Sequence, residues 1–236
     1  MSRGGSFAVK KIRELSPGSL WALDEPLRFM GIECGRRMTV IRLPSGDLLV
    51  HSPSQLDPET TSWLSSLGEP RYFVCPNRIH DAHIERAFVA YPNAEVFAPP
   101  ATSTNYRDMP FSGMLGDQPE PAWAEVVDQT VFPMGAGIAE AVMFHRPSRS
   151  LLLADLCFNV QEDASIELKA LAWLFGIYGK LSPTFDLRFT LRDRPAARRV
   201  IDRILEWDFD RVIVGHGAIC ETGGHAAFER AFAWLK

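Results

Sequence analysis

The chain has 236 residues, of which 46% are hydrophobic and 23% are charged, the balance of one folded globular domain. This composition excludes a disordered tail, a collagen and a coiled coil. The 25 Lys and Arg residues against 29 Asp and Glu residues give a net charge of −4. Because broad nucleic-acid-binding faces carry a basic excess, we expect no nucleic-acid partner.

Cysteine usage and the absence of apolar leader sequences indicate a cytoplasmic protein with no membrane association. The most apolar stretch, residues 170–177, is too short to span a bilayer, and the polar N-terminus has no signal region. We expect reduced thiols, because a disulfide framework is improbable in a chain of this length without CxxC pairs. The four widely spaced cysteines are Cys34, Cys75, Cys157 and Cys220. Residues 1–11 are expected to form a flexible N-terminal arm, followed by a single domain over residues 12–236.

The first half of the chain alternates between strand and helix patterns. The predicted order is a hairpin over 38–51, a helix over 57–67, a strand over 72–75, a helix over 84–91 and a strand over 95–98. The first helix has a complete start signal, because Asp57 is a good N-cap, Pro58 suits the first helical position and Glu59 suits the first turn. This alternation predicts an α/β fold.

Regular patterns return after an irregular stretch over residues 99–123. The expected elements are strands over 124–132, 138–144 and 151–155, helices over 164–179 and 195–207, a strand over 211–214 and a helix over 223–236. The helix over 164–179 is apolar and contains three aromatic residues. These residues are equally suited to the core, a substrate pocket or a dimer face, so a homodimer is one candidate assembly.

Polar side chains follow three of the predicted buried strands. His80, Asp81 and His83 follow the first, Asp155 ends the second, and His216 follows the third between two glycines. Each residue alone also has a structural interpretation, as a capping or turn residue. Ligands of α/β sheets bind beyond the strand ends, and three protein ligands with one open position are typical of a catalytic zinc. The pattern therefore indicates a metal site.

The order of these motifs resembles the metallo-β-lactamase superfamily over about residues 18–236. Within it, the segments 76–80, 147–151 and 155–159 resemble an uncharacterised branch, a domain of unknown function. The resemblance implies a four-layer αβ/βα sandwich and the chemistry of a hydrolase or, in some members, an oxidoreductase. It also implies that Asp155 takes the place of the bridging carboxylate and His216 that of the last histidine.

The HxHxDH metal motif of that superfamily is degenerate in this chain. Its first two histidines fall on Pro76 and Arg78, and its Asp-His pair falls on His80 and Asp81 in reversed order. The third metal histidine, expected near residues 134–137, has no counterpart. The resemblance therefore implies one metal site in place of the ordinary two-metal site.

We accordingly predict a divergent metallo-hydrolase-like protein in which one metal activates water to hydrolyse an ester, thioester, amide or phosphoester of a small-molecule substrate. Zinc is the first expected cofactor, with iron and manganese as alternatives. The candidate metal ligands are His80, His83, Asp155 and His216. The candidate catalytic residues are Asp81 and Asp155, and the candidate substrate contacts are Asn77 and Arg78.

A second interpretation starts from Pro76 and Arg78. In this interpretation the protein is a non-catalytic, metal-free relative that binds a small ligand or a protein partner. Arg78 then pairs with Asp155 or Asp81, or holds a carboxylate or phosphate of the ligand. A redox enzyme with an iron centre is a third interpretation.

Overall fold

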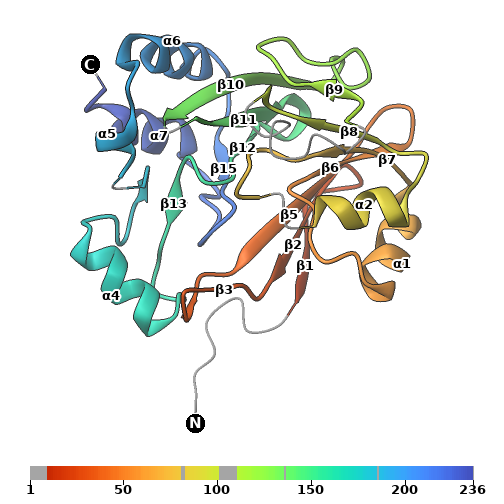
Figure 1. Ribbon diagram of the computed structural model, residues 1–236, viewed down its shortest axis with the longest axis horizontal. Helices are drawn as coiled ribbons and strands as arrows, with labels where there is room; N and C mark the ends of the chain where they lie inside the picture. Colours follow the sequence, from red (N-terminus) through yellow and green to blue (C-terminus); the bar gives the residue numbers. More distant parts are fainter. Residues whose placement is uncertain (1–9, 81–82, 101–110, 136, 185, 236) are drawn as a thin grey trace.

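The structure is a computed structural model that describes residues 10–80, 83–100, 111–135, 137–184 and 186–235. Two β-sheets pack face to face, and helices cover their outer faces (Figure 1). Both faces of each sheet are therefore covered, which explains why whole strands such as residues 20–25 are buried rather than alternating between core and solvent.

The larger sheet has seven strands in the order β1-β2-β5-β6-β7-β8-β9. These strands are β1 (Lys11–Ser16), β2 (Leu20–Glu25), β5 (Arg36–Arg42), β6 (Asp47–His51), β7 (Glu69–Val74), β8 (Glu95–Ala98) and β9 (Gly113–Met114). The antiparallel pairing of β5 with β6 confirms the predicted hairpin. From β6 onward the strands are parallel, connected by α1 (Pro58–Leu67) and α2 (Ile84–Ala90).

Helix α1 begins and ends where its local sequence predicts. The Asp57 side chain accepts a hydrogen bond from the Thr60 N–H, and Pro58 occupies the first turn. The chain leaves the helix at Gly68, whose N–H donates to the Leu64 carbonyl. Leu64 is buried against the outer face of the larger sheet, together with Ile84 of α2. The local caps therefore define the helix, and burial of one apolar face attaches it to the sheet.

The smaller sheet has four strands, with helices on its outer face. They are β10 (Val127–Gly135), β11 (Ile138–His145), β12 (Ser150–Leu152) and β15 (Arg211–Ile213). The first three are antiparallel, and β15 joins β12 in parallel. The covering helices are α6 (Arg194–Leu205) and α7 (Gly224–Phe232). The Asp193 side chain caps α6 by accepting a hydrogen bond from the Ala196 N–H.

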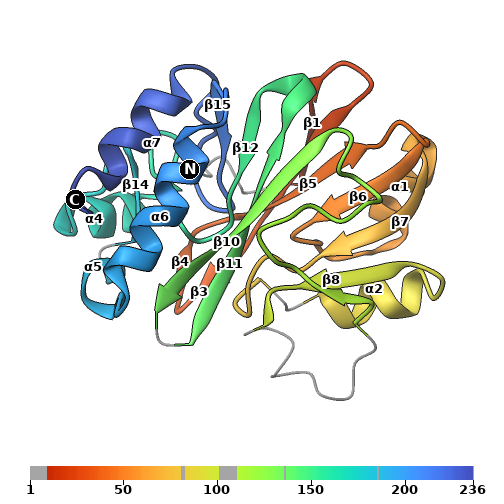
Figure 2. The same cartoon turned by 90° about the horizontal axis from the view of Figure 1, so that it is seen from above.

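Figure 2 shows the four layers in turn: the blue helices α6 and α7, the green strands of the smaller sheet, the orange and yellow strands of the larger sheet, and α1 with α2. Three clusters of buried apolar side chains fill the spaces between neighbouring layers. The central cluster brings Ile41 and Val74 of the larger sheet against Met143 and Leu152 of the smaller one. This arrangement confirms the predicted αβ/βα sandwich.

Several short elements have no counterpart in the sequence predictions. They are β3 (Arg28–Phe29), β4 (Ile32–Glu33), β9, β13 (Phe158–Asn159), β14 (Leu181–Ser182) and α5 (Leu187–Thr190). Elements of two to four residues are too short to show a periodic pattern. The apolar helix predicted over residues 164–179 is α4 (Ile166–Leu174). It ends earlier than predicted, because the chain turns at Phe175 and Gly176.

The predicted arm over residues 1–11 is mostly outside the described residues, but its end is part of the fold. Lys11 begins β1, and the Lys10 ammonium lies 2.5 Å from an Asp57 carboxylate oxygen. The sequence pattern does not predict this strand, because β1 lies at the edge of the sheet and its side chains are largely exposed and polar. None of the described helices combines the length and apolar character needed to cross a membrane.

Candidate metal centre

Three polar residues that are far apart in the sequence meet at the ends of strands. His80 follows β7, Asp155 follows β12 and His216 follows β15, and each side chain is less than one-tenth exposed. The two Nε2 atoms lie 3.1 Å apart, and each lies 3.3 Å from Asp155 Oδ1. We call this set the His-Asp-His triangle. Its three members were all predicted as metal ligands.

The second ring nitrogen of each histidine is held by an oxygen atom. His80 Nδ1 lies 2.7 Å from the Ser52 hydroxyl, and His216 Nδ1 lies 2.5 Å from the Gly35 carbonyl oxygen. A carbonyl oxygen only accepts, so His216 carries a proton on Nδ1 and directs Nε2 into the triangle. Metal-binding histidines in proteins are commonly oriented in this way by their outer nitrogen.

The dimensions and the donor atoms of the triangle fit one metal ion. Tetrahedral metal bonds of about 2.0–2.1 Å place neighbouring ligand atoms about 3.3–3.4 Å apart, close to the three distances within the triangle. Two imidazole nitrogens and one carboxylate oxygen suit zinc and also iron or manganese. Within the described part of the chain, these three residues are the one group of ligating side chains with this proximity.

The loop that carries Asp155 is held by Glu140 of β11, which is fully buried. One carboxylate oxygen of Glu140 accepts a hydrogen bond of 2.9 Å from the Ala154 N–H. The other accepts from the N–H groups of Asp155 and Leu156, at 2.7 and 3.0 Å. Three consecutive backbone donors thus converge on one side chain, which fixes the turn that aims Asp155.

Asn77 joins the Asp155 loop to the His80 loop. Its Nδ2 donates to Glu140 at 2.9 Å and to Asp155 Oδ2 at 3.0 Å. Its Oδ1 accepts from the N–H groups of Ile79 and His80, at 2.8 and 2.9 Å. The side chain is fully buried and its donors and acceptor are engaged within the protein. The Asn77 amide is therefore engaged in joining the two loops, and the predicted contact of Asn77 with substrate stays a prediction.

Arg37 of β5 holds the loop that carries His216. Its two terminal nitrogens donate to the carbonyl oxygens of Val214 and Gly217, at 2.6 and 2.9 Å, on either side of His216. Its Nε donates to Asp24 at 2.5 Å. Gly217 has a φ of +91°, and a Cβ there would lie 2.3 Å from the Asn159 carbonyl oxygen. Glycine is therefore required at this position for the loop to approach so closely.

Burial and charge act in opposite directions within the triangle. Burial opposes ionisation of Asp155, but the neighbouring His80 and His216 hold the pKa of its carboxyl well below the usual range. Burial also opposes protonation of His216, but Asp155 and Cys34 raise its pKa to about 10. At His80 burial dominates and lowers the pKa. Metal binding would displace the proton that His216 shares with Asp155.

A second carboxylate and a second guanidinium lie around this centre. Burial, followed by the charge of Asp155, raises the pKa of Glu140 to about 7. Arg36, which is 4% exposed, lies 3.2 Å from a Glu25 oxygen and donates to the Pro53 carbonyl. Its charge also acts on Asp155. Ionic groups thus extend beyond the triangle in the interior of the protein.

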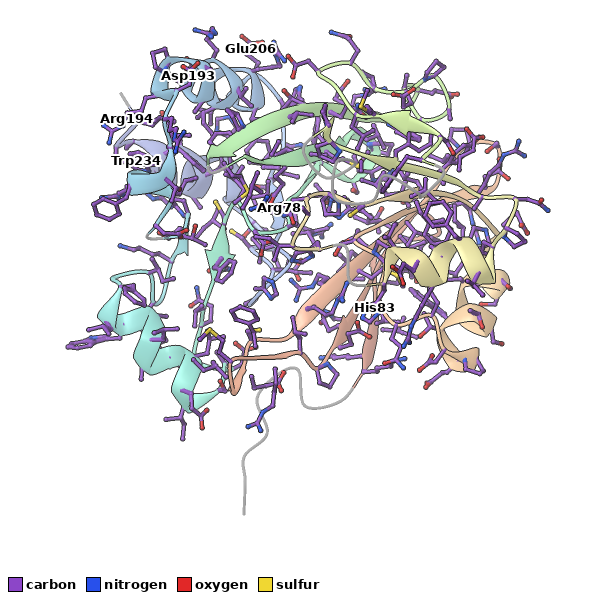
Figure 3. The ribbon with its side chains drawn as sticks, viewed as in Figure 1. Arg78, His83, Asp193, Arg194, Glu206 and Trp234 are labelled. Atoms are coloured by element: carbon purple, nitrogen blue, oxygen red, sulfur yellow. The ribbon has the colours of Figure 1, made fainter. Side chains whose placement is uncertain are left out.

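The remaining predicted site residues are not part of the triangle. His83 is half-buried at the N-cap of α2, and Arg78 is half-buried in the loop after β7 (Figure 3). No ion pair joins Arg78 to Asp155 among the residues that the structure describes. Asp81 lies outside the described residues. The structure therefore brings together three of the four predicted ligands.

Sequence patterns missed the residues that hold the triangle in place. Glu140 carries a usable signal, because it is the one acidic residue in the otherwise apolar strand pattern of residues 138–144. Arg37 has a weaker signal, since charged residues at the start of a strand are common on protein surfaces. Ser52 and the Gly35 carbonyl have none, because their roles depend entirely on which segments meet in space.

Comparison with protein families identifies the relatives of the chain. The family model described as "Domain of unknown function (DUF4336)" matches residues 17–181. The chain belongs to the DUF4336 family. A search of curated proteins gives no significant match. The match of the family model confirms the predicted resemblance to a domain of unknown function.

Solved structures show where the DUF4336 domain stands among known folds. The chain is similar to a metallo-β-lactamase from Pontibacter korlensis, with a TM-score of 0.63, 12% identity and coverage of 96% of this chain and 98% of the other. It is also similar to the metallo-β-lactamase FIM-1 from Pseudomonas aeruginosa in its mono-zinc form, with a TM-score of 0.65, 11% identity and coverage of 99% and 97%. These similarities show the metallo-β-lactamase fold of the domain.

Proposed function

We propose that this DUF4336 protein is a metal-dependent hydrolase that works with one divalent cation, zinc first and iron or manganese as alternatives. His80, Asp155 and His216 would hold the cation. The reaction would be the hydrolysis of an ester, thioester, amide or phosphoester in a small-molecule substrate. The observation that carries the proposal is the His-Asp-His triangle, whose donor atoms have the separations of ligands on a single metal ion.

The surrounding residues support this function by keeping the three ligands in position. The Gly35 carbonyl and the Ser52 hydroxyl orient the two imidazole rings. Glu140 and Asn77 orient Asp155 and keep its second oxygen, Oδ2, occupied. A bound divalent cation supplies an activated water and polarises the scissile carbonyl or phosphoryl group. Asp81 is the candidate base beside His80, and Arg78 is the candidate contact for a negative group on the substrate.

Metal analysis of the untagged protein, purified with added zinc, manganese or iron, tests the proposal. We expect about one metal ion per chain in the parent protein and less than about one-fifth in Asp155→Asn and His216→Ala. His225→Gln is the matched control, because His225 lies on α7 and bonds the Leu205 carbonyl far from the triangle. Circular dichroism and thermal unfolding establish that each variant folds.

Two results would overturn the metal proposal. One is a parent protein that retains no metal after loading with any of the three cations. The other is retention of metal by His216→Ala at the level of the parent. If metal is present, a panel of activated esters and phosphodiesters is then expected to show turnover that is lost in Asp155→Asn and kept in His225→Gln.

A metal-free relative that binds a small ligand or a protein partner is the second candidate function. The observation that favours it is the mutual pairing within the triangle, where a protonated His216 and an ionised Asp155 satisfy one another without an ion. If the protein is such a metal-free relative, its metal content is expected to be near zero and its melting temperature is expected to stay unchanged when zinc is added. A rise in the melting temperature with zinc, absent from Asp155→Asn, excludes it.

A further inference from the structure

A pocket of about 590 Å³ lies behind the His216 loop, separate from the His-Asp-His triangle. Its wall is formed by β13, β14, α5, α7 and the segment that follows His216. None of the three triangle residues lines it. The volume falls within the usual range of small-molecule sites, roughly 300–1,000 Å³.

The charges that line this pocket all have the same sign. Lys180, Arg188 and Arg230 contribute cationic side chains, and no Asp or Glu is among the described residues of the wall. Within the described residues, none of the three forms an ion pair with a carboxylate. We call Lys180, Arg188 and Arg230 the pocket cations. Their gathering is notable in a chain whose net charge is −4.

Two other surface cations of the C-terminal half of the chain are paired with carboxylates. Arg211 lies 2.9 Å from Glu221, and Arg198 lies 2.5 Å from Asp202. Like charges repel, so three unpaired cations around one concavity raise the free energy of the empty pocket. The arrangement is expected where an anion from outside the chain completes the charge balance.

The geometry of Arg188 and the rest of the wall indicate the kind of anion. The Arg188 guanidinium lies 5.2 Å from the centre of the Trp234 ring, which restrains its orientation. Figure 3 shows Trp234 beside Arg194, at the end of the molecule that carries the C-terminus. Guanidinium groups bind phosphate and carboxylate in a bidentate manner. The apolar side chains of Ile219 and Ala227 add surface for an organic part.

We propose that this pocket binds a small organic polyanion through the pocket cations. Phosphate groups or multiple carboxylates are the shared recognition chemistry. Asn159 lines the pocket and also holds the His216 loop. Its side-chain Nδ2 donates to the Ala218 carbonyl, and its main-chain carbonyl accepts from the Ala218 N–H. A ligand in the pocket thus contacts the same side chain that supports the loop after β15. The site does not depend on a metal in the triangle.

Calorimetric titration of the full chain with inorganic pyrophosphate and, separately, with citrate tests the proposal. Metal is first removed with a chelator, and the protein is then dialysed into chelator-free buffer, so that neither a metal in the triangle nor the chelator, itself a polycarboxylate, contributes. We expect binding of one anion per chain, and the tighter of the two probes distinguishes phosphate from carboxylate recognition. The double variant Lys180→Gln/Arg230→Gln is expected to bind at least tenfold more weakly. Binding is also expected to weaken as salt rises, because the contacts are ionic.

Two control variants separate this pocket from general charge and from the metal centre. Arg198→Gln removes one positive charge elsewhere on the surface and is expected to bind as the parent does. Asp155→Asn alters the triangle and is also expected to bind as the parent does. The proposal is overturned if neither probe binds below about 10 mM, if Lys180→Gln/Arg230→Gln binds as the parent does, or if Asp155→Asn abolishes binding.

Discussion

The His-Asp-His triangle and the pocket behind it use charge in opposite ways. In the triangle, every ionic side chain has a partner within the protein: Asp155 lies between two histidines and Asn77, and Glu140 accepts three backbone N–H groups. In the pocket, three cations share one concavity without a carboxylate among the described residues of its wall. The first region is buried, whereas the pocket cations are exposed.

The difference follows from the cost of removing charge from water. A buried ion without a partner costs several kcal/mol, so the interior site must be compensated by the protein itself. Exposed cations keep their hydration, so the fold tolerates their mutual repulsion without a partner from the protein, and they remain available for a ligand. We therefore expect substitutions around the triangle to change stability, and substitutions in the pocket to change binding.

Arg37→Met gives the largest expected effect. It removes the donors to the Val214 and Gly217 carbonyls and, within the described part of the chain, leaves Arg13 as the charged partner of Asp24. Loss of one partner from a buried ionic network costs about 3–5 kcal/mol of unfolding free energy. Urea unfolding measures the loss. Arg198→Met, which breaks an exposed pair on α6, is the control and is expected to cost less than about 0.5 kcal/mol. Equal losses in the two variants contradict the comparison.

His145 provides a contrast with His216, because it is buried without a carboxylate. Its Nδ1 lies 2.7 Å from the Ser148 hydroxyl, and its Nε2 has no hydrogen-bond partner within the described chain. Burial, together with the charge of Arg146, lowers the pKa of His145 from 6.5 to about 4. The unfolded chain therefore binds a proton between these pH values that the folded protein does not, so stability falls as pH falls through this window.

The expected loss from His145 is at most about 3 kcal/mol between pH 6.5 and pH 4. Urea unfolding at pH 7.5 and pH 4.5, for the parent and for His145→Gln, measures it. The variant is expected to lose less stability on acidification than the parent, because glutamine does not titrate. An identical loss in both proteins would show that other groups account for the acid sensitivity.

Asn77→Ala is expected to lower the unfolding free energy by about 2–3 kcal/mol, because it leaves the N–H groups of Ile79 and His80 without their acceptor. It also removes the link between Glu140 and Asp155, so metal retention is expected to fall together with stability. Asn93→Ala, at an exposed site, is the control. A variant as stable as the parent, with unchanged metal content, contradicts the positioning role of Asn77.

Lys180→Gln/Arg230→Gln gives the smallest expected effect. Removing two exposed like charges is expected to leave the unfolding free energy within about 0.5 kcal/mol of the parent, or to raise it slightly at low salt. Thermal and urea unfolding give the measurement. Each is carried out at about 20 mM salt, where repulsion between the cations is weakly screened, and at about 500 mM salt, where it is strongly screened. A loss above about 1 kcal/mol would show that these cations hold the fold together.

Local sequence signals determined most of the secondary structure. The caps at Asp57 and Asp193 and the turn between β5 and β6 act over a few residues, so their outcome can be read directly from the chain. Signals of this kind were absent for β3, β13 and α5, whose conformation depends on neighbouring segments. The edge strand β1 was missed because its exposed side chains show no apolar alternation.

The candidate site divides in the same way. Strand ends indicated His80, Asp155 and His216, because the residues after buried strands converge at an edge of an α/β sheet. The sequence alone did not distinguish His80 from His83, which are three positions apart in one loop. Only the tertiary structure shows that His80 is the member of the triangle. The Ser52 hydroxyl, just after β6, contacts the His80 ring, and the Asn77 amide oxygen accepts from the His80 N–H.

The sequence by itself determined the fold class, the main helices and strands, and the three polar residues at the strand ends, because periodicity, capping and strand termination are properties of short segments. The tertiary structure decided what holds those residues and which cations remain unpaired. Glu140, Arg37 and Gly35 support the triangle from β11 and from the start of β5, and the pocket cations come from three separate segments. Such long-range contacts depend on the packing of the two sheets, which no local pattern specifies.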